Sequence, residues 1–186
     1  MKKQYTVAPV IKNEKMTVTF EDLTSEGMGV AKVEGYPLFV ADGLPGERAT
    51  IKVTKVGKSF GFARIEERLS SSPDRIPTRD VKGTRVGTMP LQNLRYSAQL
   101  AFKKNNVEQV MKRIAKMPEV EVKPTIGMEN PWGYRNKAQI PVRQKDGKLV
   151  TGFFRTNTHE LIPMENFQIQ DPKIDEAIVK VRDILQ

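Results

Sequence analysis

One short stretch of the sequence combines the residue types that contact RNA. Residues 132–137 read Trp-Gly-Tyr-Arg-Asn-Lys, which places two large aromatic side chains beside two cations and an amide. Aromatic rings stack on unpaired bases, while Arg and Lys hold phosphates or stack themselves. The pattern predicts an RNA contact, although Trp132 and Tyr134 could instead be core or hinge residues beside cations that only solvate a hairpin. The candidate RNA-binding residues are Trp132, Tyr134, Arg135, Asn136, Lys137, Arg143 and Arg155, with Lys58 and Arg64 from an earlier segment.

No residue of the chain is predicted to make or break a covalent bond. His159 is the single histidine and lies in the polar run 157–160, which is typical of a surface residue. The chain has no cysteine, which excludes disulfides, thiolate metal sites and cysteine nucleophiles. Gly27, Gly29 and Gly35 lie between expected strands with no helix after them, so we interpret them as turn glycines. The sequence therefore predicts a binding site with no catalytic residue and no metal ligand.

The charge balance favours a polyanionic partner. Lys and Arg outnumber Asp and Glu by 31 to 22, and the isoelectric point is near 9.7. Excess positive charge attracts nucleic acid, although a basic soluble protein without such a partner has the same composition. The mean hydropathy is −0.48, and no apolar run approaches the roughly 20 residues of a membrane span. The first residues contain no apolar segment of a secretory signal, and the lack of cysteine fits a reducing compartment, so a cytoplasmic protein is expected.

Closely spaced strands are expected between residues 15 and 69. Apolar and polar residues alternate there, and glycine-containing turns separate the alternating segments, which indicates an antiparallel meander. Several short strands in one run suit a small closed barrel of OB type, because closure removes exposed edges. On such a barrel Lys52, Lys55, Lys58 and Arg64 should lie on the outer surface. Residues 1–14 are expected to form a flexible tail. The five expected strands are 16–20, 30–33, 38–40, 49–53 and 60–65.

The rest of the chain has mixed patterns. Residues 70–90 are rich in Ser, Pro and Arg and are expected to form a basic, irregular linker. Helical spacing and an Asp146-Gly147 turn signal then predict a small α+β domain over residues 91–186. The chain stops within a helical pattern with no Gly or Pro after it, so the polypeptide is expected to continue. The expected elements are helices 97–116 and 171–186, a strand 120–126, and a hairpin of strands 138–142 and 149–154.

Four motifs give these elements a family resemblance. The segment Leu23–Ala31, Leu-Thr-Ser-Glu-Gly-Met-Gly-Val-Ala, resembles the opening of a TRAM domain, an RNA-binding barrel of OB type. The second half resembles the central domain of TrmA-type RNA (uracil-5-)-methyltransferases. The stretches that carry this resemblance are Met89–Tyr96 with Gln99 and Leu100, Tyr134–Ala138, and Gly152–Arg155. The expected fold class is therefore a β-barrel, an OB-like TRAM domain, followed by a small α+β domain.

The resemblance implies the RNA-binding portion of a methyltransferase whose catalytic domain lies downstream. In this family a later Rossmann-type domain binds S-adenosylmethionine, attacks uracil with a cysteine and removes a proton with a carboxylate, and no such residue can be carried over here. Many members also hold an iron–sulfur cluster, and the matching positions here are Asp80, Val86, Met89 and Phe167, none of which supplies a thiolate. The resemblance therefore implies a cluster-free member in which Val86, Met89 and Phe167 pack in the place of the cluster. Such bacterial members methylate 23S ribosomal RNA, and a monomer without membrane association is expected.

Two further functions are consistent with part of these features. A stand-alone TRAM-type RNA-binding protein without enzymatic activity is the main alternative, and a coding frame that stops after Gln186 would favour it. A methylthiotransferase fragment is disfavoured, because those enzymes carry the TRAM domain at their C-terminal end and need cluster cysteines. The transfer-RNA enzymes of the wider family generally lack the barrel, so the resemblance favours ribosomal RNA.

Overall fold

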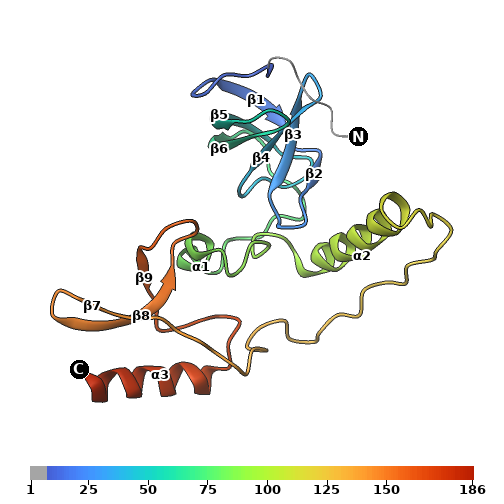
Figure 1. The fold of residues 1–186 in the computed structure, drawn as a ribbon. Coiled ribbons are helices and arrows are strands. Elements are labelled where there is room, and N and C mark those ends of the chain that lie inside the picture. Colours follow the sequence, from blue (N-terminus) through green and yellow to red (C-terminus); the bar gives the residue numbers. More distant parts are fainter. Residues whose placement is uncertain (1–7) are drawn as a thin grey trace. The chain divides into compact units, whose positions relative to one another are not determined.

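The structure, a computed structural model, describes residues 8–186 and contains two compact units (Figure 1). Of the described residues, the first unit comprises 8–77 and Pro90–Lys123, and the second comprises Thr78–Met89 and Pro124–Gln186. Residues 90–123 thus group with the barrel, whereas the sequence placed them in the second domain. Residues 1–7, half of the expected tail, lie outside the described residues.

The first unit contains a six-stranded sheet that curls into a half-barrel (Figure 1). Its strand order is β1-β5-β6-β4-β3-β2, and all neighbours are antiparallel except β4 and β6. The OB-like barrel is confirmed, with one strand more than the five expected, because the two-residue β2 is too short to show alternation. The strands are β1 Lys15–Thr19, β2 Asp22–Leu23, β3 Gly29–Val33, β4 Tyr36–Val40, β5 Arg48–Val56 and β6 Gly61–Arg68.

Period-two alternation builds the core of the barrel. In β5, Ala49, Ile51 and Val53 are fully buried, while Lys52 alternates with them on the opposite face. A register shift between Val53 and Lys55 makes Lys55 the partner of Phe62 and turns it to that outer face as well. The core extends to Val10, which is 3% exposed, and the backbone N–H of Asn13 donates to the Val53 carbonyl at 2.8 Å. Residues 8–14 therefore pack on the barrel, contrary to the expected flexible tail.

The glycine-rich turn after β2 contacts a distant motif of the same unit. Gly27 has φ +80°, and a Cβ built on it would lie 2.9 Å from Cδ2 of Leu91. Only glycine combines a left-handed backbone with so close an approach. The TRAM motif Leu23–Ala31 therefore packs against Pro90 and Leu91 of the second motif. The sequence alone predicts that these two motifs lie in different domains.

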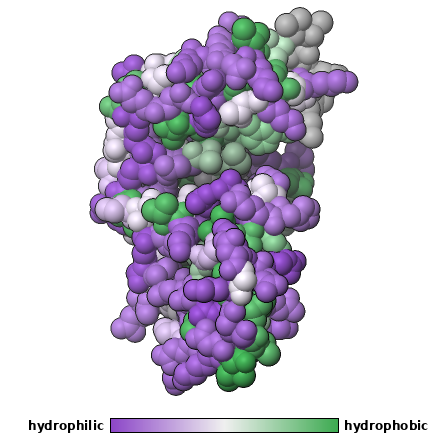
Figure 2. Space-filling model, turned by 90° about the vertical axis from the view of Figure 1, so that its left-hand side faces the viewer, coloured by the Kyte–Doolittle hydropathy of each residue, from purple (hydrophilic) through white to green (hydrophobic). Residues whose placement is uncertain are grey.

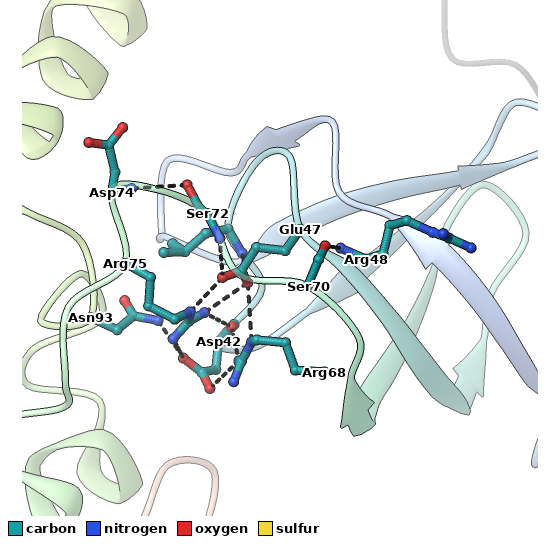
Figure 3. Close-up of polar contacts among 10 residues, drawn as sticks. Asp42, Glu47, Arg48, Arg68, Ser70, Ser72, Asp74, Arg75 and Asn93 are labelled. Carbon is teal, nitrogen blue, oxygen red and sulfur yellow. Dashed lines mark hydrogen bonds and ion pairs between the residues drawn. The ribbon is translucent and has the colours of Figure 1, made fainter.

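Residues 70–77 contain no helix or strand, as expected, but they are held on the barrel and do not form a free linker. The backbone N–H of Ile76 donates to the Asn93 carbonyl at 2.9 Å, and that of Arg95 donates to the Asp74 carbonyl at 2.8 Å. The side chain of Arg75 contacts the buried carboxylate of Glu47 (Figure 3). These contacts explain why residues 90–95 belong to the first unit.

The long helix α2, Tyr96–Arg113, follows this pairing. Its first turns pack Ala98 and Phe102 against a cluster of Leu23, Leu44 and Leu94. The helix ends earlier than the expected residue 116. Its later apolar residues Val107 and Val110, and Ile114 directly after it, are exposed. No strand forms over 120–126, where Ile126 is 96% exposed, so the strand prediction was wrong.

The second unit contains a three-stranded antiparallel sheet in the order β7-β8-β9. The Asp146-Gly147 turn is confirmed, with φ +51° and +76° as a type I′ hairpin requires. The first hairpin strand begins at Val142 and not at residue 138, and β9 and α1 were not expected. The elements are α1 Val81–Val86, β7 Val142–Lys145, β8 Lys148–Phe154, β9 Leu161–Pro163 and α3 Pro172–Leu185.

The last helix, α3, begins as the sequence predicts. The side chain of Asp171 accepts a hydrogen bond from the backbone N–H of Lys173 at 2.9 Å, and Pro172 occupies the first turn. The side chains of Val181, Ile184 and Leu185 are 55%, 83% and 66% exposed. Hydrophobic atoms gather accordingly at the lower end of Figure 2. None of the helices described over residues 8–186 is long and apolar enough to cross a membrane.

Candidate nucleic-acid interface

Trp132 is positioned by a cation from a distant segment of the same unit. The Arg79 guanidinium carbon lies 4.3 Å from the centroid of the Trp132 ring, within range of a cation–π contact. Nε of Arg79 also donates to Oε1 of Gln168 at 2.7 Å, which fixes the guanidinium over the ring. The sequence had assigned Arg79 to the basic linker, and no local pattern connects it with Trp132.

Backbone hydrogen bonds hold the segment 132–137 beside residues 168–171. The N–H of Gly133 donates to the Gln168 carbonyl at 3.1 Å, and the N–H of Arg135 donates to the Ile169 carbonyl at 2.8 Å. The Arg135 carbonyl accepts in turn from the N–H of Asp171 at 2.9 Å. Because the backbone supplies these contacts, the side chains need not anchor the segment.

The side chains that follow Trp132 are therefore presented to solvent. Tyr134 is 54% exposed, and Arg135, Asn136 and Lys137 are exposed as well. Trp132 itself is only half-buried. The segment thus offers two aromatic rings, two cations and an amide on one backbone-anchored strip, which suits contact with unpaired bases and their phosphates.

The other two candidates of the second unit have intramolecular partners. Arg143, on β7, places its guanidinium carbon 5.4 Å from the centroid of the Phe154 ring. Arg155 forms a salt bridge with Glu160 at 3.0 Å between Nη1 and Oε2. His159, the single histidine, is exposed with its ring centroid 6.5 Å from that of Phe154, as expected of a surface residue.

The barrel candidates Lys58 and Arg64 are both exposed in the first unit. Nε of Arg64 lies 2.8 Å from a Glu66 carboxylate oxygen, and Nζ of Lys15 lies 3.2 Å from the other. The hydrogen bonds from Arg64 and then Lys15 hold the pKa of Glu66 below its ordinary value. The charge of Arg64 is therefore partly offset, whereas Lys58 enters no salt bridge among the described residues.

The four positions that match cluster cysteines in the family which the sequence resembles come together in the second unit. Asp80, Met89 and Phe167 line one cavity of only about 10 Å³, together with Arg135. Val86 packs on the hydrophobic cluster that contains Phe167. A carboxylate, a thioether and two hydrocarbon side chains cannot replace four thiolates, so these residues do not fit an iron–sulfur cluster.

Steric crowding within this unit explains why residue 152 of the motif is a glycine. A Cβ built on Gly152 would lie 2.0 Å from the carbonyl oxygen of Ile162, because β8 and β9 approach closely there. The next residue, Phe153, meets Phe167 edge to face with ring centroids 4.9 Å apart. The motif Gly152–Arg155 thus packs the sheet against the region around Met89 and Phe167.

The chain is similar to known RNA methyltransferases over most of its length. The TRAM domain pattern matches residues 9–65. A protein of Enterococcus faecalis named as an uncharacterized RNA methyltransferase is 60% identical over 178 residues, which cover 96% of this chain and 39% of that protein. A protein of the same name from Lactiplantibacillus plantarum is 51% identical over the same shares. The chain thus spans about 39% of the length of these relatives.

A solved structure shares the fold of both units. The tRNA (uracil-54, C5)-methyltransferase of Pyrococcus abyssi, in complex with S-adenosyl-L-homocysteine, aligns with a TM-score of 0.60 and 22% sequence identity. The alignment covers 90% of this chain and 36% of the archaeal one.

Proposed function

We propose that the chain is part of a TrmA-like RNA methyltransferase, namely the RNA-binding, substrate-recognition portion of a 23S ribosomal RNA (uracil-5-)-methyltransferase. The observation that carries the proposal is the exposed strip 132–137, which follows a TRAM barrel in the same chain. The strip presents Tyr134, Arg135 and Lys137 to solvent while its backbone is bonded to residues 168–171.

Catalysis is assigned to residues outside these 186. Methylation of uracil C5 requires a nucleophile, and a chain without cysteine lacks the one that this family uses. The strands of the described residues are joined without a Gly-rich strand–loop–helix unit that would hold S-adenosylmethionine. In the full-length parent, S-adenosylmethionine would supply the methyl group, and this portion would select and hold the RNA.

Binding of defined RNAs to the 186-residue chain tests the proposal. A labelled 23S ribosomal RNA hairpin with unpaired uridines is titrated with the chain. Two unlabelled competitors are then added in separate experiments: the same sequence as a plain duplex, and transfer RNA. The proposal expects the hairpin to bind best, since base-reading contacts favour splayed bases. Stronger binding of transfer RNA would indicate that the substrate is transfer RNA and not ribosomal RNA. Equal binding of all three RNAs would show charge-driven association and overturn selective recognition.

The alternative of a stand-alone RNA-binding protein is separated by a second measurement. The coding frame downstream of residue 186 is sequenced from the source genome. A following Rossmann-type domain supports the methyltransferase portion, and a stop codon supports the stand-alone protein.

A further inference from the structure

Three phenylalanine rings form a cluster on the first unit. The ring centroid of Phe39 lies 5.4 Å from that of Phe60 and 5.9 Å from that of Phe62, and Phe60 and Phe62 are 5.7 Å apart. Phe60 is 41% exposed, and the other two rings are half-buried. Three of the eight phenylalanines of the chain thus meet at a solvent-facing position instead of in a core.

The strand register places these rings outside the barrel. Phe39 lies in β4 between the buried residues Leu38 and Val40, and Phe62 lies in β6 between the buried residues Gly61 and Ala63. Alternation therefore turns both rings to the outer face, where they are direct partners in the parallel β4–β6 pair.

Lysines flank the rings on the same face. Lys55 of β5 is the register partner of Phe62, and Lys58 lies in the turn between Gly57 and Phe60. Both lysines are exposed, and neither enters a salt bridge among the described residues. By contrast, Arg64 is paired with Glu66 on this face. The two lysines beside the rings therefore carry charge that no salt bridge compensates.

We propose that Phe39, Phe60 and Phe62, with Lys55 and Lys58, form a base-stacking site for single-stranded RNA, which we call the phenylalanine patch. Unpaired bases would stack on the rings, and the two lysines would contact the adjoining phosphates. The proposal rests on the RNA-binding function above and adds a second contact surface, on the barrel.

Two features favour RNA over a protein partner. The interplanar angles of 41°, 63° and 83° show that the rings meet tilted or edge to face, so no two of them stack face to face. The flanking charge is positive, as a phosphate backbone requires, whereas the core of a protein interface is depleted of lysine. Stacking needs no particular base, so the patch would bind single strands with little sequence preference.

The test measures the affinity of the 186-residue chain for a labelled oligouridylate of about ten nucleotides, single-stranded or annealed to its complement. Phe60→Ala is the main variant, because Phe60 is the most exposed ring and its loss disturbs the fold least. Leu69→Ala is the matched control, since Leu69 is a 47% exposed apolar residue of the same unit outside the patch. We expect Phe60→Ala to weaken single-strand binding by about tenfold and Leu69→Ala to leave it unchanged.

Two further measurements keep the outcomes distinct. Phe60→Trp should retain the affinity, and its added fluorescence should be quenched when the single strand binds. The double variant Phe60→Ala/Phe62→Ala should lose more, with sedimentation and melting temperature confirming a folded chain in the same oligomeric state.

The possible results separate this proposal from the proposed function. A wild-type chain that binds RNA, with Phe60→Ala and the double variant binding equally well, overturns the phenylalanine patch and leaves the RNA-binding function standing. A chain that binds no RNA overturns both. A Phe60→Ala variant with altered self-association and unchanged RNA affinity would assign the patch to a protein interface.

Discussion

Two nitrogen atoms of the Arg75 guanidinium donate hydrogen bonds to the fully buried carboxylate of Glu47. Its Nε lies 2.5 Å from Oε1 and its Nη2 lies 2.9 Å from Oε2, in the fork geometry of a bidentate pair. The same carboxylate accepts hydrogen bonds from the backbone N–H groups of Leu44 and Ser72, and from Arg68 at 3.3 Å (Figure 3). One side chain with 0% exposure thus joins the end of the barrel to the segment that follows β6.

We expect Glu47→Gln to destabilise the first unit by about 3 kcal/mol. The amide cannot balance the charges of Arg75 and Arg68, and removing one partner of a buried pair leaves the other uncompensated. Urea unfolding of the 186-residue chain measures the change. Glu67→Gln, an exposed carboxylate of β6, is the control and should change the stability little. Equal stability of Glu47→Gln and wild type would show that the network is not a structural link.

The Glu47 network also predicts a loss of stability in acid. Burial alone would raise the pKa of Glu47, but hydrogen bonds from Arg75, Ser72 and Leu44 outweigh burial and hold the pKa below its ordinary value. Because the pKa is lower in the folded chain than in the unfolded chain, the stabilisation is present above the ordinary pKa of about 4.3 and is lost as the pH falls through the folded value. The stability gap between wild type and Glu47→Gln should therefore stay constant at neutral pH and shrink below about pH 4. A gap that widens in acid would contradict this assignment.

The barrel could be predicted because its strands carry their own signal. Ala49, Ile51 and Val53 alternate with polar residues, and this pattern alone fixes which face is buried. The link between residues 74–76 and 93–95 could not be predicted, since it depends on a pairing between segments far apart in the sequence. For the same reason a composition rich in Ser, Pro and Arg suggested a linker where Arg75 is in fact bound to the barrel.

In the candidate site, too, some features follow from the local sequence and others depend on the tertiary fold. The exposure of Tyr134, Arg135 and Lys137 agrees with the polar, cationic character of their segment. The contact of Arg79 with Trp132 depends on the tertiary fold, and no local sequence pattern indicates it. Alternation around Phe39 and Phe62 does place both rings on the outer face of the barrel, so the phenylalanine patch had a signal in the sequence.

The isolated chain should not transfer methyl groups. Incubated with S-adenosylmethionine and unmodified ribosomal RNA, it should form no 5-methyluridine, because the chain has no cysteine to act as the nucleophile that the proposed reaction requires. Mass spectrometry of the digested RNA measures the product, with an active relative of full length as the positive control. Formation of 5-methyluridine above background would place catalysis within these 186 residues.

The last prediction concerns Arg135. Its backbone N–H and carbonyl anchor the strip 132–137, and its side chain is exposed. Arg135→Ala keeps the backbone bonds, so the melting temperature should stay close to that of wild type. If the guanidinium contacts RNA, the affinity for a hairpin with unpaired uridines should fall by about 1–3 kcal/mol.

A matched control decides whether this loss is specific to Arg135. Lys180→Ala removes one exposed cation of α3 in the same unit. It should cost less affinity and mainly lower the slope of affinity against salt, as the loss of a single non-specific phosphate contact does. Arg135→Ala should weaken binding to unpaired uridines more than binding to plain duplex, because a stacking or base contact is lost together with the charge. If both variants lose the same affinity for both RNAs, Arg135 acts only as a charge. A folded Arg135→Ala chain with wild-type affinity would show that the strip 132–137 does not touch RNA through this residue.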